Sequence, residues 1–211
     1  MIIHDMPQLS DEWFNIRLGE VTASRFAEAT AKGKNGGVSP TRNKLLNKLA
    51  FERIYNKPYP EKFKSTDAMQ HGTDTEAEAR NYFSKLFKYD INQVGYVEYN
   101  DDIGCSPDGL IGADGMVELK CPLVSTHMDY IKSKSKKLLS TYKKQVQGQL
   151  FVTGRKWCYL VSYVPLYPKR LMISVKIERD EDEIKRLNVD LVMFVEDLKK
   201  AIIELEPNVS F

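Results

Sequence analysis

Length, composition and charge indicate an ordinary globular chain. Its 211 residues are 42% hydrophobic and 28% charged, and the formal net charge of +2 is too small to indicate a nucleic-acid binder by itself. The length suits a single domain over residues 1–211, and no apolar run approaches ~20 residues, so no membrane span is expected. No basic segment followed by an apolar stretch opens the chain, so we expect a cytoplasmic protein.

Several classes of site are excluded by residue spacing. The three cysteines show no C-x-x-C pair, which argues against a disulfide framework and against a four-cysteine zinc or iron–sulfur cluster. The three histidines form no H-x-x-x-H pair, so zinc hydrolysis has no support. The glycine-rich loop 32–37 lacks the G-x-x-x-x-G-K-[ST] pattern of a nucleotide-binding P-loop.

The first predicted elements are two short helices. Ser10 can cap a helix over residues 10–17 whose Trp13 faces the core, and Thr22 can cap a second helix that begins after Gly19. The start of a helix offers free N–H groups that suit a phosphate, although an ordinary cap explains the same residues.

Two longer helices and a strand follow. Apolar residues recur at helical spacing over residues 41–55 and 66–87, with a proline-marked break between them. Glu76 lies in the second of these helices, where a glutamate is usually solvated. Residues 94–99 have the pattern of a strand.

The stretch over residues 104–122 carries the strongest chemical signal. Aliphatic residues flank Ala113-Asp114-Gly115, which predicts two strands joined by a tight turn with Gly115 in the left-handed conformation. This register places Asp108 opposite Lys120 and Leu110 opposite Glu118. Because side chains alternate along a strand, two acids and one lysine then share a face.

Two carboxylates and a lysine on one face suit a divalent cation. Magnesium takes carboxylate, carbonyl and water oxygens, so Asp108, Glu118 and the carbonyl of Leu119 form a candidate ligand set. The ion would lower the pKa of a water, and Lys120 would orient that water or stabilise charge on a phosphate. The alternative is an exposed hairpin with an ordinary Glu–Lys pair, but the Ser-Pro-Asp-Gly string upstream and the Cys-Pro exit favour the metal site.

Basic residues follow this hairpin at 132–137 and 143–144, where a solvated surface and a phosphate contact both remain open. A helix over residues 140–151 places Gln145 and Gln149 on one face. Strands over 156–164 and 170–178 and a helix over 180–205 complete an α/β (mixed α+β) fold with a central mixed β-sheet flanked by helices.

Five local motifs together resemble a known family. Pro107-Asp108 followed by Glu118-Leu119-Lys120 is the pattern of the PD-(D/E)xK nucleases, and the surrounding strings resemble the phage lambda exonuclease and YqaJ-type viral recombinase family. The same family is matched by W-x-x-x-R-L-G-x-x-T-A-S over residues 13–24, G-x-x-x-E-x-x-A-R over 72–80 and Q-x-Q over 145–147. The resemblance spans roughly residues 10–180.

The resemblance implies a restriction-endonuclease-like core and a Mg²⁺-dependent exonuclease that degrades one strand of double-stranded DNA from its 5′-phosphorylated end to mononucleotides. Glu76 would join the metal site, assisting a second ion, and whether Mn²⁺ can substitute is open. Gln145 would help to hold the terminal nucleotide. The implied 5′-phosphate ligands are Arg17, Ser24 and Ser106, and Met69 falls where the family carries an apolar wedge.

The resemblance also implies partners. Family members form a toroidal homotrimer around DNA and pass the remaining 3′ strand to a single-strand annealing protein (synaptase) during phage recombination, in the cytoplasm of the bacterial host. Two other functions stay open: a structure-selective DNA endonuclease of the same fold, and a catalytically silent module that binds DNA ends. The intact Asp108, Glu118 and Lys120 disfavour the silent module, because binding alone does not require that set.

Overall fold

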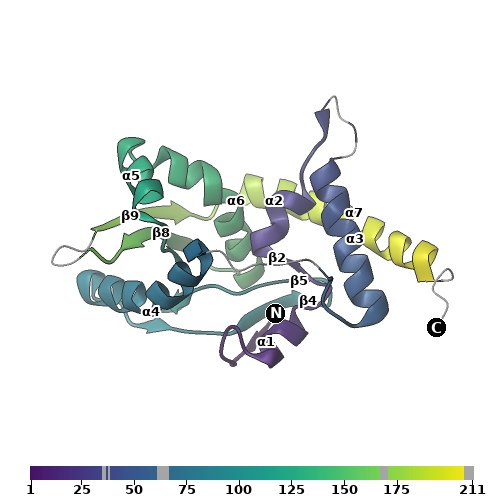
Figure 1. The fold of residues 1–211 in the computed structure, drawn as a ribbon, viewed down its shortest axis with the longest axis horizontal. Helices are drawn as coiled ribbons and strands as arrows, with labels where there is room; N and C mark the ends of the chain where they lie inside the picture. Colours follow the sequence, from purple (N-terminus) through teal and green to yellow (C-terminus); the bar gives the residue numbers. More distant parts are fainter. Residues whose placement is uncertain (35–36, 38, 61–66, 167–170, 207–211) are drawn as a thin grey trace.

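A computed structural model describes residues 1–34, 37, 39–60, 67–166 and 171–206, with the backbone alone for residues 67–74 (Figure 1). Its helices are α1 (Asp11–Ile16), the 3₁₀ helix η1 (Ala23–Arg25), α2 (Phe26–Ala29), α3 (Pro40–Tyr55), α4 (Asp67–Phe87), α5 (Val124–Lys132), α6 (Lys136–Thr153) and α7 (Glu181–Leu205). Its strands are β1 (Ile2–His4), β2 (Val21–Thr22), β3 (Ile91–Asn92), β4 (Tyr96–Asn100), β5 (Ile103–Cys105), β6 (Gly109–Ile111), β7 (Gly115–Lys120), β8 (Trp157–Val164) and β9 (Leu171–Glu178).

The strands form two mixed sheets. One has the order β1-β4-β5-β2, and the other has the order β3-β6-β7-β8-β9. In the larger sheet β7 is antiparallel to β6 and parallel to β8, and α5 and α6 make the crossover between the two parallel strands. The predicted α+β class, a mixed sheet flanked by helices with a crossover behind the E-x-K strand, is therefore confirmed, with the strands divided between two sheets.

Alternate residues of β7 face different helices. Val117 and Leu119 pack in an apolar cluster with Ala79 and Phe83 of α4, whereas Met116 packs in the main core with Leu150 of α6. Because side chains alternate along a strand, Glu118 and Lys120 lie on the α6 side. The catalytic candidates of β7 therefore project between the sheet and α6.

The helix predictions agree closely with the structure. Ser10 accepts a hydrogen bond from the backbone of Trp13 as the cap of α1, and Asp180 caps α7 in the same way. Thr22 stands at the cap position of η1, but its hydroxyl contacts Ser24 rather than a helix N–H. The helix that contains Gln145 begins at Lys136, so the end of the predicted basic run is its first turn. Within the described residues, none of the helices combines the length and the apolar character of a membrane span.

The predicted register of the hairpin is wrong by two residues. Leu110 pairs with Met116, not with Glu118. The left-handed glycine of the turn is Gly112, with φ +52°, and Gly115 is the first residue of β7. A shift of two keeps every side chain on its predicted face, because the side-chain period of a strand is also two.

Candidate active site

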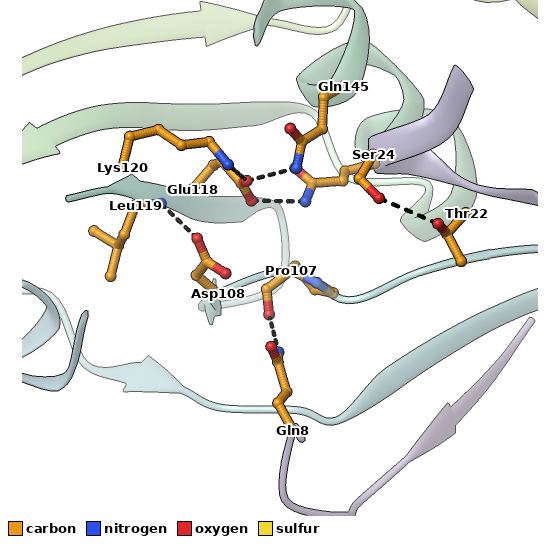
Figure 2. Close-up of polar contacts among 10 residues, drawn as sticks. Gln8, Thr22, Ser24, Pro107, Asp108, Glu118, Leu119, Lys120 and Gln145 are labelled. Atoms are coloured by element: carbon orange, nitrogen blue, oxygen red, sulfur yellow. Dashed lines mark hydrogen bonds and ion pairs between the residues drawn. The ribbon is translucent and has the colours of Figure 1, made fainter. Parts of the chain in front are cut away.

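Glu118 is the centre of a buried polar cluster between β7 and α6. Its carboxylate is 2% exposed. Lys120 Nζ lies 2.6 Å from Oε1, and the Gln145 amide donates to the same oxygen at 2.6 Å (Figure 2). The Gln149 amide donates to Oε2 at 2.7 Å. A buried carboxylate needs such partners, so these three donors fix its position.

Gln149 was not predicted as a site residue. Its i, i+4 spacing puts it on the same helix face as Gln145, and that spacing is the signal that could have identified it. Gln147, which lies between them, instead donates to the carbonyl of Glu178 at 2.8 Å and so faces away from the site.

Asp108 lies in a bend just before β6, rather than opposite Lys120 on the strand. Its Oδ2 accepts a hydrogen bond from the backbone N–H of Leu119 at 2.6 Å, as Figure 2 shows. In an extended strand the N–H and C=O of one residue point to the same side, so the Leu119 carbonyl also faces the side of β7 on which Asp108 lies. The predicted ligand set of Asp108, Glu118 and the Leu119 carbonyl is thus gathered at the end of β7.

Glu76 approaches this end of β7 from α4. It is paired with Arg80 one turn further along the helix, and Arg80 also donates from Nε to the carbonyl of Asp108 at 2.9 Å. Arg80 therefore ties α4 to the bend that carries Asp108. Met69 lies in the part of α4 whose side chains are outside the described residues, so its predicted wedge role is untested.

Two acids of this cluster, Asp108 and Glu76, have a raised pKa. Burial raises the pKa of Asp108 well above its usual range, and the charges of Glu118 and Glu76 raise it further. Burial also raises the pKa of Glu76, against the opposing effect of Arg80. For Lys120, burial acts to lower the pKa, but the carboxylates of Glu118 and Asp108 outweigh burial, so the net effect is to raise it.

These residues fit a divalent cation by their chemistry. Carboxylate and carbonyl oxygens are the ligands that Mg²⁺ takes, and the crowded negative charge around Asp108 is what a cation would relieve. Across the described ranges, no group of three or more His, Cys, Asp or Glu side chains is already arranged around a common point that could hold an ion. Lys120 and Gln145 both contact Oε1 of Glu118, whereas Gln149 alone donates to Oε2, so Oε2 keeps a lone pair that could bind a metal.

A second group of candidates surrounds Trp13. The guanidinium of Arg17 lies 3.6 Å from the centroid of the indole ring, and the indole N–H lies 2.9 Å from the hydroxyl of Ser106. Burial lowers the pKa of Arg17 to about 10, which leaves it charged at neutral pH. Trp13, predicted only as a core residue, thus links two of the predicted phosphate ligands. Ser24 is exposed on η1, with its hydroxyl 3.2 Å from that of Thr22.

The two groups of candidates are joined where η1 and α2 pack on α6. A Cβ on Gly148 would lie 2.4 Å from the ring of Phe26 and 3.5 Å from the side chain of Ala23, so only glycine permits this approach. Ser24 directly follows Ala23 and therefore lies beside this contact. Gly148 in turn is one helical turn from Gln145 on α6. Ser106 is two residues from Asp108.

The basic segment is partly neutralised within the protein. Lys137 pairs with Asp129 at 2.7 Å, and Lys143 pairs with Glu183 at 2.5 Å. The ammonium of Lys144 donates to the hydroxyl of Thr30 at 3.0 Å.

The two-sheet fold and the Asp108–Glu118–Lys120 constellation define a PD-(D/E)xK nuclease fold. The family model for the YqaJ-like viral recombinase domain matches residues 12–156. The chain therefore belongs to the YqaJ-like viral recombinase domain family.

Solved structures agree with this assignment. An alkaline exonuclease (LHK-Exo) from Laribacter hongkongensis is 33% identical, with a TM-score of 0.83 over 94% of this chain and 97% of that one. The same protein in complex with dAMP gives a TM-score of 0.84 at the same identity and coverage. A phage-related exonuclease from Haemophilus somnus 129PT shares the fold, with a TM-score of 0.72 at 15% identity over 88% of this chain and 96% of that one. Among the curated proteins compared, none matches.

Proposed function

We propose that this protein is a Mg²⁺-dependent exonuclease that degrades one strand of double-stranded DNA from its 5′-phosphorylated end to mononucleotides. The observation that carries the proposal is the buried Glu118 carboxylate, held by Lys120, Gln145 and Gln149 beside Asp108 at the end of β7. The similarity to an alkaline exonuclease over nearly the whole chain supports it. That relative also binds dAMP, a mononucleotide of the kind that the proposed reaction releases.

Asp108, Glu118 and the Leu119 carbonyl would hold the first metal ion, with Glu76 assisting a second. When bound, magnesium would lower the pKa of the attacking water and offset negative charge on the scissile phosphate. Mn²⁺ has the same preference for oxygen ligands and is expected to substitute.

The protein's own side chains would carry out the remaining steps of the proposed reaction. Lys120 pairs with Glu118 and would stabilise the charge that develops on the scissile phosphate and orient the water. The ring of Tyr142, whose centroid lies 4.7 Å from Nζ, restricts the ammonium from the other side. Gln145 positions Glu118 and has a second polar atom available for the terminal nucleotide.

The 5′-phosphate would bind between Arg17, Ser24 and Ser106. Arg17 is half-buried, and its side chain makes no hydrogen bond or ion pair with any other described residue, so its guanidinium is available to a phosphate. The guanidinium fork suits two phosphate oxygens at once. Preference for a phosphorylated end would follow from this pocket.

We base the proposed biological role on the family to which the chain belongs. The 3′ single strand left by the reaction would pass to a single-strand annealing protein during phage-type recombination, and the enzyme would act as a toroidal homotrimer around duplex DNA. Met69 would act as a wedge at the duplex end.

An end-labelled duplex tests the proposal. With Mg²⁺, mononucleotides should leave only from a 5′-phosphorylated end, and a chelator should stop their release. Arg17→Ala should remove the preference for the phosphate. Internal cuts would instead favour a structure-selective endonuclease, and a shifted but uncut band would favour a silent end-binding module.

A further inference from the structure

We propose that Glu52 and Arg53 of α3 are positioning residues for the DNA-end pocket, acting together as a clamp on Gly19. This inference rests on the proposed function, because it concerns how Arg17 and Ser24 are held for the 5′-phosphate. Neither residue belongs to the motifs by which the chain resembles its family.

The clamped segment is a tight turn between two pocket residues. The N–H of Glu20 bonds to the carbonyl of Arg17 at 3.2 Å, which closes a turn with Gly19 at its third position. Gly19 has φ +72°, a conformation that favours glycine. Arg17 thus begins the turn, and Ser24 follows Gly19 by five residues.

Both polar groups of Gly19 are held by α3. Its N–H donates to Glu52 Oε2 at 3.1 Å, and its carbonyl accepts from Arg53 Nε at 2.8 Å. Glu52 is only 8% exposed, although it is a charged residue. A Cβ on Gly19 would lie 2.6 Å from Cγ of Arg53, so the clamp closes directly on the backbone. Two consecutive residues of α3 therefore hold both the N–H and the carbonyl of Gly19, which fixes the position and the orientation of the turn.

Asp102 connects the clamp to the last helix. Its side chain accepts from Arg53 Nη1 and from Lys199 of α7, each at 2.7 Å. Its backbone carbonyl accepts the N–H of Val21 at 2.9 Å, on the other side of the same turn. Helix α7 lies outside the matched part of the family model, and this contact gives it a link to the pocket.

The clamp matters for binding because Arg17 has no polar anchor of its own. Its side chain rests on Trp13, so its direction depends on where the backbone of the turn lies. A shift of the turn would move the guanidinium relative to Ser106, which is carried by a different segment. Loss of the clamp is therefore expected to weaken recognition of the phosphate more than the cleavage step itself.

The test compares 5′-phosphorylated with 5′-hydroxyl duplex ends, measuring kcat and KM for each. Arg53→Lys keeps the charge but cannot reproduce the separate bonds of Nε to Gly19 and of Nη1 to Asp102. Glu52→Ala removes the acceptor for the N–H of Gly19 and also that for the N–H of Tyr59. We expect each variant to reduce the phosphate preference by about tenfold or more, mainly through KM for phosphorylated ends. Glu52→Gln retains an oxygen for the Gly19 N–H and should restore most of the preference.

Asp197→Asn is the matched control. It breaks the 2.7 Å ion pair between α7 and Arg42, at the opposite end of α3 from the clamp, and should leave the preference unchanged. If Glu52→Ala does not fold, Arg53→Lys carries the test. An unchanged preference in Arg53→Lys, or an equal loss of turnover on both kinds of end, would overturn the clamp. A wild-type enzyme with no phosphate preference would instead refute the proposed pocket.

Discussion

Glu118 shows how much of the candidate site depends on one carboxylate. A charge that is 2% exposed is costly to bury unless its oxygens are hydrogen-bonded, and Lys120, Gln145 and Gln149 supply those bonds. These three donors come from β7 and α6, so the geometry of the site is set by how that helix packs on that strand.

Lys120→Ala tests the role of the ammonium. We expect turnover to fall by roughly 10²-fold or more, because a positioned cation at the scissile phosphate is lost, while binding to duplex DNA is retained. Single-turnover cleavage and a gel-shift titration measure the two quantities. Turnover within a factor of two of wild type would remove Lys120 from the mechanism.

Gln149→Leu tests a residue that the motifs do not contain. Oε2 of Glu118 loses its buried donor, so stability should fall by about 1–3 kcal/mol and kcat by about tenfold. Gln147→Leu is the control on the same helix: it loses the bonds to the Glu178 carbonyl and the Asp180 N–H, and kcat should not change. Equal kcat for both variants would show that Gln149 only stabilises the fold.

The residue types of the site could be predicted, but their detailed contacts could not. The strand period of two placed Glu118 and Lys120 on one face, and the Ser-Pro-Asp-Gly string and the Cys-Pro exit favoured a site that includes Asp108. The turn contains two nearby glycines, and nothing local decides which becomes left-handed. Gly115 has a tertiary role instead: the ring of Trp157 on the neighbouring strand lies so close that a Cβ on residue 115 would be 2.2 Å away.

At the scale of elements, the sequence predicts the periodic helices well, but it does not predict where elements distant in the chain pack against each other. Helices α3, α4 and α7 follow from apolar spacing, which is local. The division of the strands into two sheets, and the close contact between Phe26 and Gly148, depend on residues far apart in the chain. The α3 clamp on Gly19 belongs to the same kind of contact.

Glu20 provides a prediction about stability and pH. Burial raises its pKa to about 7 from an ordinary 4.5, while Tyr96 donates a hydrogen bond to it. The folded protein thus holds the proton more tightly than the unfolded chain does. The stabilisation is complete below pH 4.5 and is lost as the pH rises through 7.

Glu20→Gln should remove this dependence. The difference in unfolding free energy between wild type and variant should change by on the order of 1–2 kcal/mol between pH 4.5 and 8, after allowance for partial exposure. Urea titrations across that range measure it, and the difference isolates Glu20 from the other carboxylates. A difference that is constant with pH would contradict the assignment.

At the scale of the whole molecule, the proposed trimer gives a direct expectation. Light scattering in solution should report about three times the chain mass of 24.3 kDa. A mass that stays at 24.3 kDa at every concentration would contradict the assembly and leave the single-chain chemistry untouched.

The central claim is that Asp108 and Glu118 hold one ion between them. Calorimetric titration of Mn²⁺ into wild type, Asp108→Asn and Glu118→Gln tests this claim most directly. Asp114→Asn is the control, because Asp114 is an exposed acid in the turn of the same hairpin. The first two variants should each lose at least about tenfold in affinity, and Asp114→Asn should match wild type. Wild-type affinity in Asp108→Asn or Glu118→Gln would contradict the account.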